Sequence, residues 1–306
     1  MRTALVTGAL GFIGRNLCNK LESLGVIVNK VDNMSLGKPK IGDRFIWSGT
    51  EDPRLLPFVL SDNLDYIFHF GSPCSVLQYG EDPVKALKET VLGFKNMLDL
   101  AKYTKARLVY PSSGNVYGNI EPPYDERINP NPTNLYGMGK LICEKMAVTS
   151  SYNDIVGLRI FTSYGPGEER KKGFSSIPHI FLKEMMEDRK PVIWGNGEQK
   201  RDCIYIDDLV ECIVKVANHL DPPKIMNVGT GIEHSYNEIV EIINKVLGTE
   251  IEPIYKHTSK PLGYVDRAFC DTYCIKKYTE IVPRNLEEGI RKFYSYLSDN
   301  DGRQNN

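Results

Sequence analysis

The chain has 306 residues, of which 41% are hydrophobic and 25% charged, and its formal net charge is −1. This composition is ordinary for a globular protein, and so small a net charge produces no overall field that would gather nucleic acid or an anionic membrane. No apolar run approaches the roughly 18 residues that a membrane-spanning helix needs. We therefore expect no nucleic-acid partner and no membrane partner.

The first residues and the cysteines indicate the compartment. Early glycines in MRTALVTGALGFIG interrupt the apolar stretch that a secretory signal would need. The odd number of cysteines and the lack of a CxxC pair favour reduced thiols, buried as small hydrophobic side chains, over disulfides. The cysteines stand at positions 18, 74, 143, 203, 212, 270 and 274. We expect a cytoplasmic protein, and because its 5 histidines show no metal-binding spacing we expect no metal.

Short β-rich runs and helical stretches alternate through the first half of the chain. In chain order, we expect a strand at Thr3–Thr7, a helix at Arg15–Leu24, strands at Val26–Asp32 and Tyr66–Phe70, a helix at Val84–Tyr103, a strand at Arg107–Pro111, a helix at about Leu135–Tyr152 and a strand at Val156–Phe161. The strands are nearly unbroken apolar runs, which is typical of a parallel sheet covered on both faces. The pattern predicts an α/β fold with a doubly wound parallel sheet of the Rossmann type.

After Gly165 the alternation loosens, and glycines separate short elements. Helices are still predicted at about Asp207–Asn218 and Tyr236–Leu247. We expect a nucleotide-binding domain over residues 1–165 and a smaller C-terminal α/β substrate lobe over 166–306, with Asp207–Asn218 able to return to the first domain. The polar tail Ser298–Asn306 is expected to be frayed.

A glycine-rich loop joins the first strand to the first helix. Gly8, Gly11 and Gly14 allow a tight turn, close backbone approach to a pyrophosphate and close packing of the helix on the strand. Phe12 and Ile13 lie in the same turn, where free N–H groups at the helix N-terminus attract phosphates. The loop predicts a dinucleotide cofactor.

Asp32 ends the second predicted strand, 24 residues after Gly8. A carboxylate at this place accepts the ribose hydroxyls of NAD and repels a 2′-phosphate, so NAD is the predicted cofactor. Two alternatives remain open. Asp32 could simply begin the turn that reaches Gly37, and Lys30 and Lys38 keep NADP in consideration.

Tyr136 and Lys140 stand four residues apart in a predicted helix, which brings the phenol and the ammonium onto one face. The spacing alone is weak, because Tyr273 and Lys277 repeat it. Tyr136 differs because Ser113 lies about 20 residues earlier, after an apolar strand, at the sheet edge where α/β folds bind ligands. We predict Ser113, Tyr136 and Lys140 as catalytic residues; the alternative is that Tyr136 is an ordinary packed aromatic.

A phenol with a pKa of about 10 is a poor base at neutral pH. Lys140 and a positively charged nicotinamide ring would both favour the phenolate, and lowering the pKa by about 3 units corresponds to roughly 4 kcal/mol. Ser113 could then hold a substrate hydroxyl and relay its proton.

Five segments together resemble one family. They are TGALGFIG at 7–14, HFGSP at 69–73, SSGNVYG at 112–118, YGMGK at 136–140 and RDCIYIDDL at 201–209. They resemble the extended short-chain dehydrogenases/reductases that act on nucleotide sugars, over nearly the whole chain. The resemblance implies tightly held NAD, a nucleotide-diphosphate sugar as substrate, and a homodimer through a four-helix bundle formed by helices that match Val84–Tyr103 and Leu135–Tyr152.

The resemblance also implies particular contacts. NAD would contact Asn33, Phe70, Gly71 and Ser72 besides the residues already named. The sugar nucleotide would contact Ser112, Ser113, Asn115, Thr162, Lys172, Arg201 and Arg267.

Some of these substrate contacts have a competing interpretation. Lys172 matches a lysine that acts as a second base in the ADP-heptose 6-epimerases, although a phosphate-facing or solvated basic loop is the favoured explanation. Thr162 replaces the family's usual Asn, which puts that contact in doubt. Guanidinium forks suit diphosphate oxygens, so Arg201 and Arg267 are the diphosphate candidates, with surface salt bridges as the alternative.

Departures from the family patterns indicate the reaction. Dehydratases and decarboxylases of this family carry an acid next to the serine segment, where this chain has Gly114 and Asn115. The remaining groups suffice for reversible oxidation at C4, so the leading hypothesis is 4-epimerisation of a UDP-hexose. The alternatives are a dehydrogenase that releases a keto sugar, a decarboxylase, dehydratase or heptose-epimerase-like relative, and a non-catalytic NAD-binding regulator.

Overall fold

A computed structural model of the chain describes residues 1–40, 42–55, 63–171, 173–257 and 264–304, with side chains described up to Asp299. Its centre is a parallel sheet of seven strands in the order β10-β6-β5-β4-β1-β2-β3. The strands are β1 (Thr3–Thr7), β2 (Ile27–Asp32), β3 (Phe45–Trp47), β4 (Tyr66–His69), β5 (Arg107–Ser113), β6 (Ile155–Ile160) and β10 (Ile225–Val228). The doubly wound α/β fold predicted from the sequence is confirmed.

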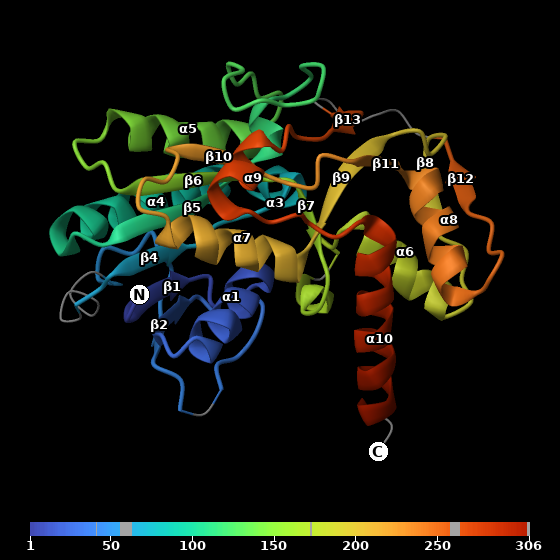
Figure 1. The fold of residues 1–306 in the computed structure, drawn as a ribbon, viewed down its shortest axis with the longest axis horizontal. Helices are drawn as coiled ribbons and strands as arrows, with labels where there is room; N and C mark the ends of the chain where they lie inside the picture. Colours follow the sequence, from blue (N-terminus) through green and yellow to red (C-terminus); the bar gives the residue numbers. More distant parts are fainter. Residues whose placement is uncertain (41, 56–62, 172, 258–263, 305–306) are drawn as a thin grey trace.

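Helices cover both faces of this sheet (Figure 1). One face carries α1 (Phe12–Ser23), α7 (Ile206–Asn218) and α9 (Tyr273–Thr279); the other carries α3 (Val76–Glu81), α4 (Pro83–Thr104) and α5 (Leu135–Thr149). The alternation along each strand explains why both layers are needed. In β1, Ala4 and Val6 join the core under α1 and α7, whereas Leu5 joins the core under α4 and α5.

Polar caps fix where the two outer helices begin. Asp82 accepts a hydrogen bond from the backbone of Lys85 ahead of Pro83, which can occupy a first helical turn because its missing N–H would be unpaired there. Asn134 caps α5 in the same way, accepting from Gly137 N. The asparagine therefore sets the position of Tyr136 in the first turn of α5.

A second group of elements lies beyond one end of the main sheet (Figure 1). A four-stranded sheet contains β7 (Thr162–Tyr164), β9 (Lys200–Tyr205), β11 (Glu233–Ser235) and β13 (Arg267–Ala268), and a small sheet contains β8 (Val192–Trp194) and β12 (Ile254–Lys256). Helices α6 (Ile177–Met186), α8 (Tyr236–Leu247) and α10 (Leu286–Gln304) pack with them, and short 3₁₀ turns occupy η1 (Gly114–Val116) and η2 (Glu168–Lys171).

The chain crosses between the two groups more than once. Helix α7 packs on α1, and β10 pairs with β6, although both follow residue 165. We propose two lobes, with the first completed by these returning segments.

Some expectations need correction. The segment from Ser298 was expected to be frayed, but α10 continues to Gln304. All seven cysteines are free thiols, yet Cys74 is exposed and Cys274 only half-buried, so the expectation of seven buried cysteines is wrong for these two. In the described part of the chain, no helix combines the length and the apolarity required to cross a bilayer.

Candidate active site

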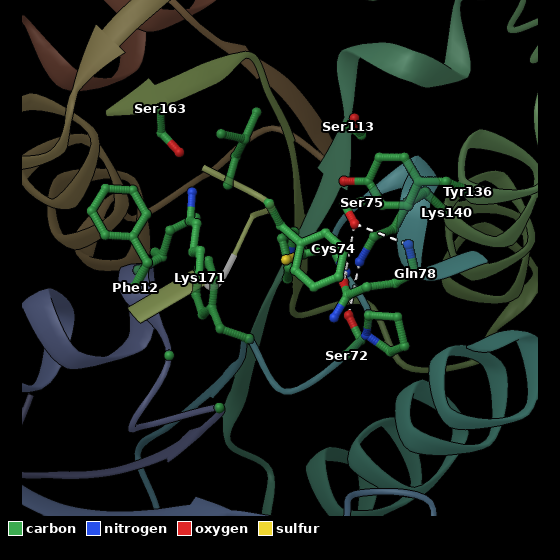
Figure 2. A pocket seen from close by; sticks show the side chains of 18 of the residues that line it. Phe12, Ser72, Cys74, Ser75, Gln78, Ser113, Tyr136, Lys140, Ser163 and Lys171 are labelled. Atoms are coloured by element: carbon green, nitrogen blue, oxygen red, sulfur yellow. Dashed lines mark hydrogen bonds between the residues drawn. The ribbon is translucent and has the colours of Figure 1, made fainter. Parts of the chain in front are cut away.

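A cavity of about 680 Å³ opens at the carboxyl ends of the central strands and reaches from Asp32 to Tyr136. Its walls come from both lobes. Figure 2 shows Phe12, Ser163 and Lys171 on one side and Tyr136 and Lys140 on the other. Every residue predicted to contact the cofactor lines this cavity.

The glycine loop occupies the place where β1 and β4 lie side by side. Gly8 has φ +66°, and a Cβ there would lie 2.5 Å from the carbonyl oxygen of Phe70. A Cβ on Gly14 would lie 2.0 Å from the carbonyl oxygen of Gly8. These positions therefore exclude any larger residue. Because α1 begins after Gly11 with no side-chain cap, its first N–H groups remain available to a pyrophosphate.

Asp32 stands at the carboxyl end of β2, where only 7% of the residue is exposed. Its carboxylate accepts hydrogen bonds from Leu10 N (2.9 Å) and Met34 N (2.7 Å), so it both fixes the following turn and faces the cavity. Lys30, which had kept NADP in consideration, instead pairs with Asp43 at 2.6 Å and Glu22 at 2.7 Å.

The predicted catalytic side chains lie together. Tyr136 and Lys140 occupy successive turns of α5, with the Lys140 ammonium 5.8 Å from the centre of the Tyr136 ring. Lys140 Nζ donates to Ser72 Oγ at 2.9 Å (Figure 2). Ser113, the last residue of β5, hydrogen-bonds Tyr136, and its hydroxyl oxygen accepts from Asn115 N at 3.1 Å.

Several predicted substrate contacts line the cavity, among them Asn115, Thr162 and Arg201. The Arg201 guanidinium lies over the rings of Tyr236 and Tyr264, at 5.9 and 5.3 Å from their centres. The aromatic pair holds Arg201 at the cavity wall.

Other predicted contacts need correction or lie outside the structure. Arg267 is not among the residues that line the cavity, because Glu233 and Glu121 pair with its guanidinium. Ser112 lines the cavity, and its hydroxyl donates to Glu144 at 2.5 Å, which leaves only its lone pairs for a ligand. Lys172 lies outside the described residues.

The structure adds residues that the sequence reasoning missed. Lys171 lines the cavity with its ammonium 4.2 Å from the centre of the Phe12 ring and 3.0 Å from Glu168 Oε1. The basic loop was recognised from its sequence, but Lys171 itself was not named as a contact. Cys74 also lines the cavity, and nothing in the cysteine spacing signalled it.

Comparisons with known proteins agree with this geometry. The family model described as the NAD dependent epimerase/dehydratase family matches residues 4–229. The chain belongs to this family. The resemblance to extended short-chain dehydrogenases/reductases is thereby confirmed, and NAD is the cofactor.

Individual members of the family that resemble the chain differ in the reaction that their names give. UDP-glucuronic acid decarboxylase 1 of Xenopus tropicalis is 32% identical, over 96% of this chain and 71% of that protein. The ADP-L-glycero-D-manno-heptose-6-epimerase of Brachyspira hyodysenteriae is 30% identical, over 92% and 98%. The crystal structure of Thermotoga maritima UDP-glucose 4-epimerase with UDP-glucose superposes with a TM-score of 0.90 at 28% identity, over 97% and 99%. The chain is therefore a nucleotide-sugar enzyme of the epimerase/dehydratase class.

The cavity fits the cofactor of the family. Its glycine cradle has no room for a side chain, its helix N-terminus is uncapped, and Asp32 offers carboxylate oxygens at the ribose end. When bound, NAD supplies the acceptance and return of a hydride. Tyr136, Lys140 and Ser113 would orient the reacting hydroxyl and move its proton.

The chain by itself holds Tyr136 in its neutral form. Burial raises the pKa of the Tyr136 phenol above its ordinary value, and the hydrogen bond from Ser113 opposes this only in part. Burial also lowers the pKa of Lys140. In the chain alone desolvation of the phenol dominates, so the expected fall in the pKa of Tyr136 depends on the nicotinamide charge as well as on Lys140.

We therefore predict that the pKa of Tyr136 falls when oxidised NAD is added, because a nearby positive charge favours phenolate. Ultraviolet difference spectra of tyrosinate would be recorded against pH, with Tyr136→Phe subtracted to remove the other tyrosines. A Tyr136 signal that titrates at the same pH with and without NAD would contradict the role of Tyr136 as base.

Proposed function

We propose that the protein is an NAD-dependent nucleotide-sugar 4-epimerase that acts on a UDP-hexose. The proposal depends on one observation. Ser113, Tyr136 and Lys140 lie together, and the residue hydrogen-bonded to the Ser113 hydroxyl is Asn115 rather than an acid. Among the described residues that line the cavity, the only carboxylates are Asp32, Glu51 and Glu89. Asp32 ends β2, and Glu51 follows β3, the neighbouring strand.

The residue beside Ser113 argues against elimination and decarboxylation. Burial and the neighbouring charge of Glu51 both raise the pKa of Glu89. Beside Ser113 the chain offers Asn115, whose amide hydrogen-bonds the Ser113 hydroxyl at 3.3 Å. An amide cannot exchange a proton with a substrate at neutral pH, so this wall supports oxidation and reduction only.

In the proposed reaction Tyr136 and Ser113 act both when C4 is oxidised and when it is reduced again. Tyr136 would take the proton of the C4 hydroxyl while the C4 hydride would pass to oxidised NAD held on the glycine loop, which gives a 4-keto sugar. Ser113 holds the C4 oxygen throughout. After the sugar turns over, the hydride returns to the opposite face of C4 and Tyr136 gives back the proton. The UDP-glucose bound to the Thermotoga enzyme supports a UDP-hexose as substrate.

The proposal predicts epimerisation without exchange of carbon-bound hydrogen. Incubation with UDP-glucose, UDP-N-acetylglucosamine and GDP-mannose in deuterated water should convert one of them to its C4 epimer, with no deuterium on carbon. Tyr136→Phe should abolish turnover while NAD stays bound. Deuterium incorporated next to a carbonyl would contradict hydride return and favour enolisation, and stoichiometric NADH would favour a dehydrogenase.

We further propose that Lys171 contacts the substrate diphosphate. Its ammonium lies beside Phe12, the first residue of the helix whose N-terminus faces the cofactor pyrophosphate, and it is one of three cations among the described lining residues, with Lys140 and Arg201. A cation at this place reduces the repulsion between two diphosphates bound in one cavity.

Lys171→Met should weaken binding of UDP about tenfold or more, because a charge-assisted hydrogen bond contributes about 1.5–3 kcal/mol. Calorimetry with UDP and with uridine measures the effect, and uridine affinity should not change. Lys183→Met, an exposed lysine of α6, is the matched control. Equal losses for UDP and uridine would show that Lys171 supports the fold of the loop instead.

Helices α4 and α5 present exposed apolar side chains next to each other, and we propose that they form a homodimer interface. The residues, with their exposed fractions, are Val84 (76%), Leu92 (38%), Tyr103 (71%), Leu135 (42%), Met138 (42%), Ile142 (41%) and Val148 (74%). The two helices contact each other on one face of the central sheet. Pairing of two such faces would bury them in a four-helix bundle.

The dimer should dissociate when a charge enters this face. Ile142→Glu should reduce the mass measured by light scattering from that of a dimer to that of a monomer, since an unpaired buried carboxylate is costly. Leu220→Glu, at a residue 98% exposed outside α4 and α5, should leave the mass unchanged. A monomeric wild-type protein would refute the proposal.

A further inference from the structure

A buried ion pair joins the helix that carries Tyr136 to the central sheet. Arg159 of β6 donates to both oxygens of the Glu144 carboxylate, from Nε at 2.9 Å and from Nη2 at 2.7 Å. Only 4% of the Arg159 side chain and 8% of the Glu144 side chain are exposed. The two-pronged geometry fixes both the distance and the orientation between α5 and β6.

Glu144 continues the catalytic face of α5. Tyr136, Lys140 and Glu144 are spaced four residues apart, so they occupy the same side of three successive turns. All three side chains are buried. A helix shift that displaced Glu144 from Arg159 would therefore carry Tyr136 and Lys140 with it.

The same carboxylate also holds the strand that carries the catalytic serine. Ser112 donates its hydroxyl proton to Glu144 Oε1, and Ser112 lies directly opposite Arg159 in the pairing of β5 with β6. Ser113 is the next residue. Glu144 thus bonds Ser112, which precedes Ser113 in β5. It also lies on α5, the helix that carries Tyr136, and Tyr136 is hydrogen-bonded to Ser113.

Further hydrogen bonds engage Nη1 of the arginine. Arg159 Nη1 donates to the hydroxyl of Tyr117 at 2.8 Å, and that hydroxyl donates to Asn227 Oδ1 at 2.8 Å. Asn227 lies in β10, and its backbone N–H donates to Glu126 at 2.7 Å. The network therefore spans α5, β5, β6 and β10.

We propose that Glu144 and Arg159 are positioning residues that set Tyr136 against Ser113, a role that rests on the proposed function. Stability alone is a poor reason for such a pair. Burying two charges is costly, and replacing a buried ion pair with apolar side chains of similar volume is often neutral or stabilising. The contacts of the pair, by contrast, join α5, which carries Tyr136, to β5, which carries Ser113.

The decisive variant removes the charges without leaving one of them unpaired. Glu144→Leu combined with Arg159→Met should lower the urea-unfolding midpoint less than Glu144→Gln does, because only the Ser112 hydroxyl loses its acceptor, and it should retain NAD. It should lower kcat about tenfold to a hundredfold with little change in KM, since a displacement of about 1 Å can cost a hundredfold in rate. Glu144→Gln, which leaves Arg159 without its countercharge, should lose both stability and kcat.

A control ion pair lies at the other end of β5, the strand that ends with Ser112 and Ser113. Arg107 begins β5 and pairs with Asp154 at 2.5 Å, away from the catalytic residues. Arg107→Met combined with Asp154→Leu should leave kcat within about twofold of wild type. An equal loss of kcat in both double variants, or none in Glu144→Leu/Arg159→Met, would overturn the positioning role.

A second readout separates this inference from the proposed function. The tyrosinate titration of Tyr136 in the NAD complex needs no substrate, and its midpoint should shift in Glu144→Leu/Arg159→Met but not in the control. If the wild type epimerises none of the sugars, the proposed reaction fails while this titration still tests the positioning role. An unchanged titration midpoint of Tyr136 in Glu144→Leu/Arg159→Met would refute the positioning role.

Discussion

The structure depends on one close backbone contact at the carboxyl edge of the sheet. The chain leaves β1 and β4 side by side there, and Gly8 lies so close to Phe70 and Gly71 that a Cβ would lie 2.5 Å from a carbonyl oxygen. Because α1 must start at once and pack closely, Gly14 is pressed against Gly8 in turn. The contact brings the uncapped start of α1 to the point where strand order reverses, where open α/β sheets bind ligands.

The cavity carries charges of both signs along its length. Its acids Asp32, Glu51 and Glu89 come from β2, the segment after β3, and α4, whereas Lys140, Lys171 and Arg201 come from α5, η2 and β9. The cations are separated, since Lys171 lies on the side of Phe12 and Lys140 on the side of Tyr136. A protein with a net charge of only −1 thus holds acids for ribose hydroxyls and separate cations for phosphates in one cavity.

Features set by local sequence were predictable. The glycine loop, Asp32, and the spacing of Tyr136 and Lys140 each depend on neighbouring residues, and each lies in the predicted element. Ser113 required only the knowledge that a strand ends there. Strands β3 and β10 were missed because they are short and lack a periodic pattern that could distinguish them from loops.

Side chains whose partners are distant in sequence were not predictable. Ser112 is taken up by Glu144, 32 residues later, and Arg267 by Glu233 and Glu121. Either residue would suit a substrate contact in chemical type, so only the three-dimensional neighbours show that Arg267 pairs away from the cavity and that Ser112 donates within the protein. The entry of Lys171 into the cavity depends on how a four-residue 3₁₀ turn is anchored. The fully buried Glu168 carboxylate, which accepts from the hydroxyl of Ser176, provides that anchor.

Two buried charged systems stand on the same face of α5, and they are satisfied to different degrees. Glu144 and Arg159 are paired in both prongs and surrounded by further partners, which is what a rigid support requires. Lys140, equally buried, makes one side-chain hydrogen bond within the described residues, to Ser72, although an ammonium has three donors. A buried polar group that keeps unused capacity costs stability unless something else completes it. The contrast agrees with the proposed support by Glu144 and Arg159 and with the proposed ligand contact of Lys140.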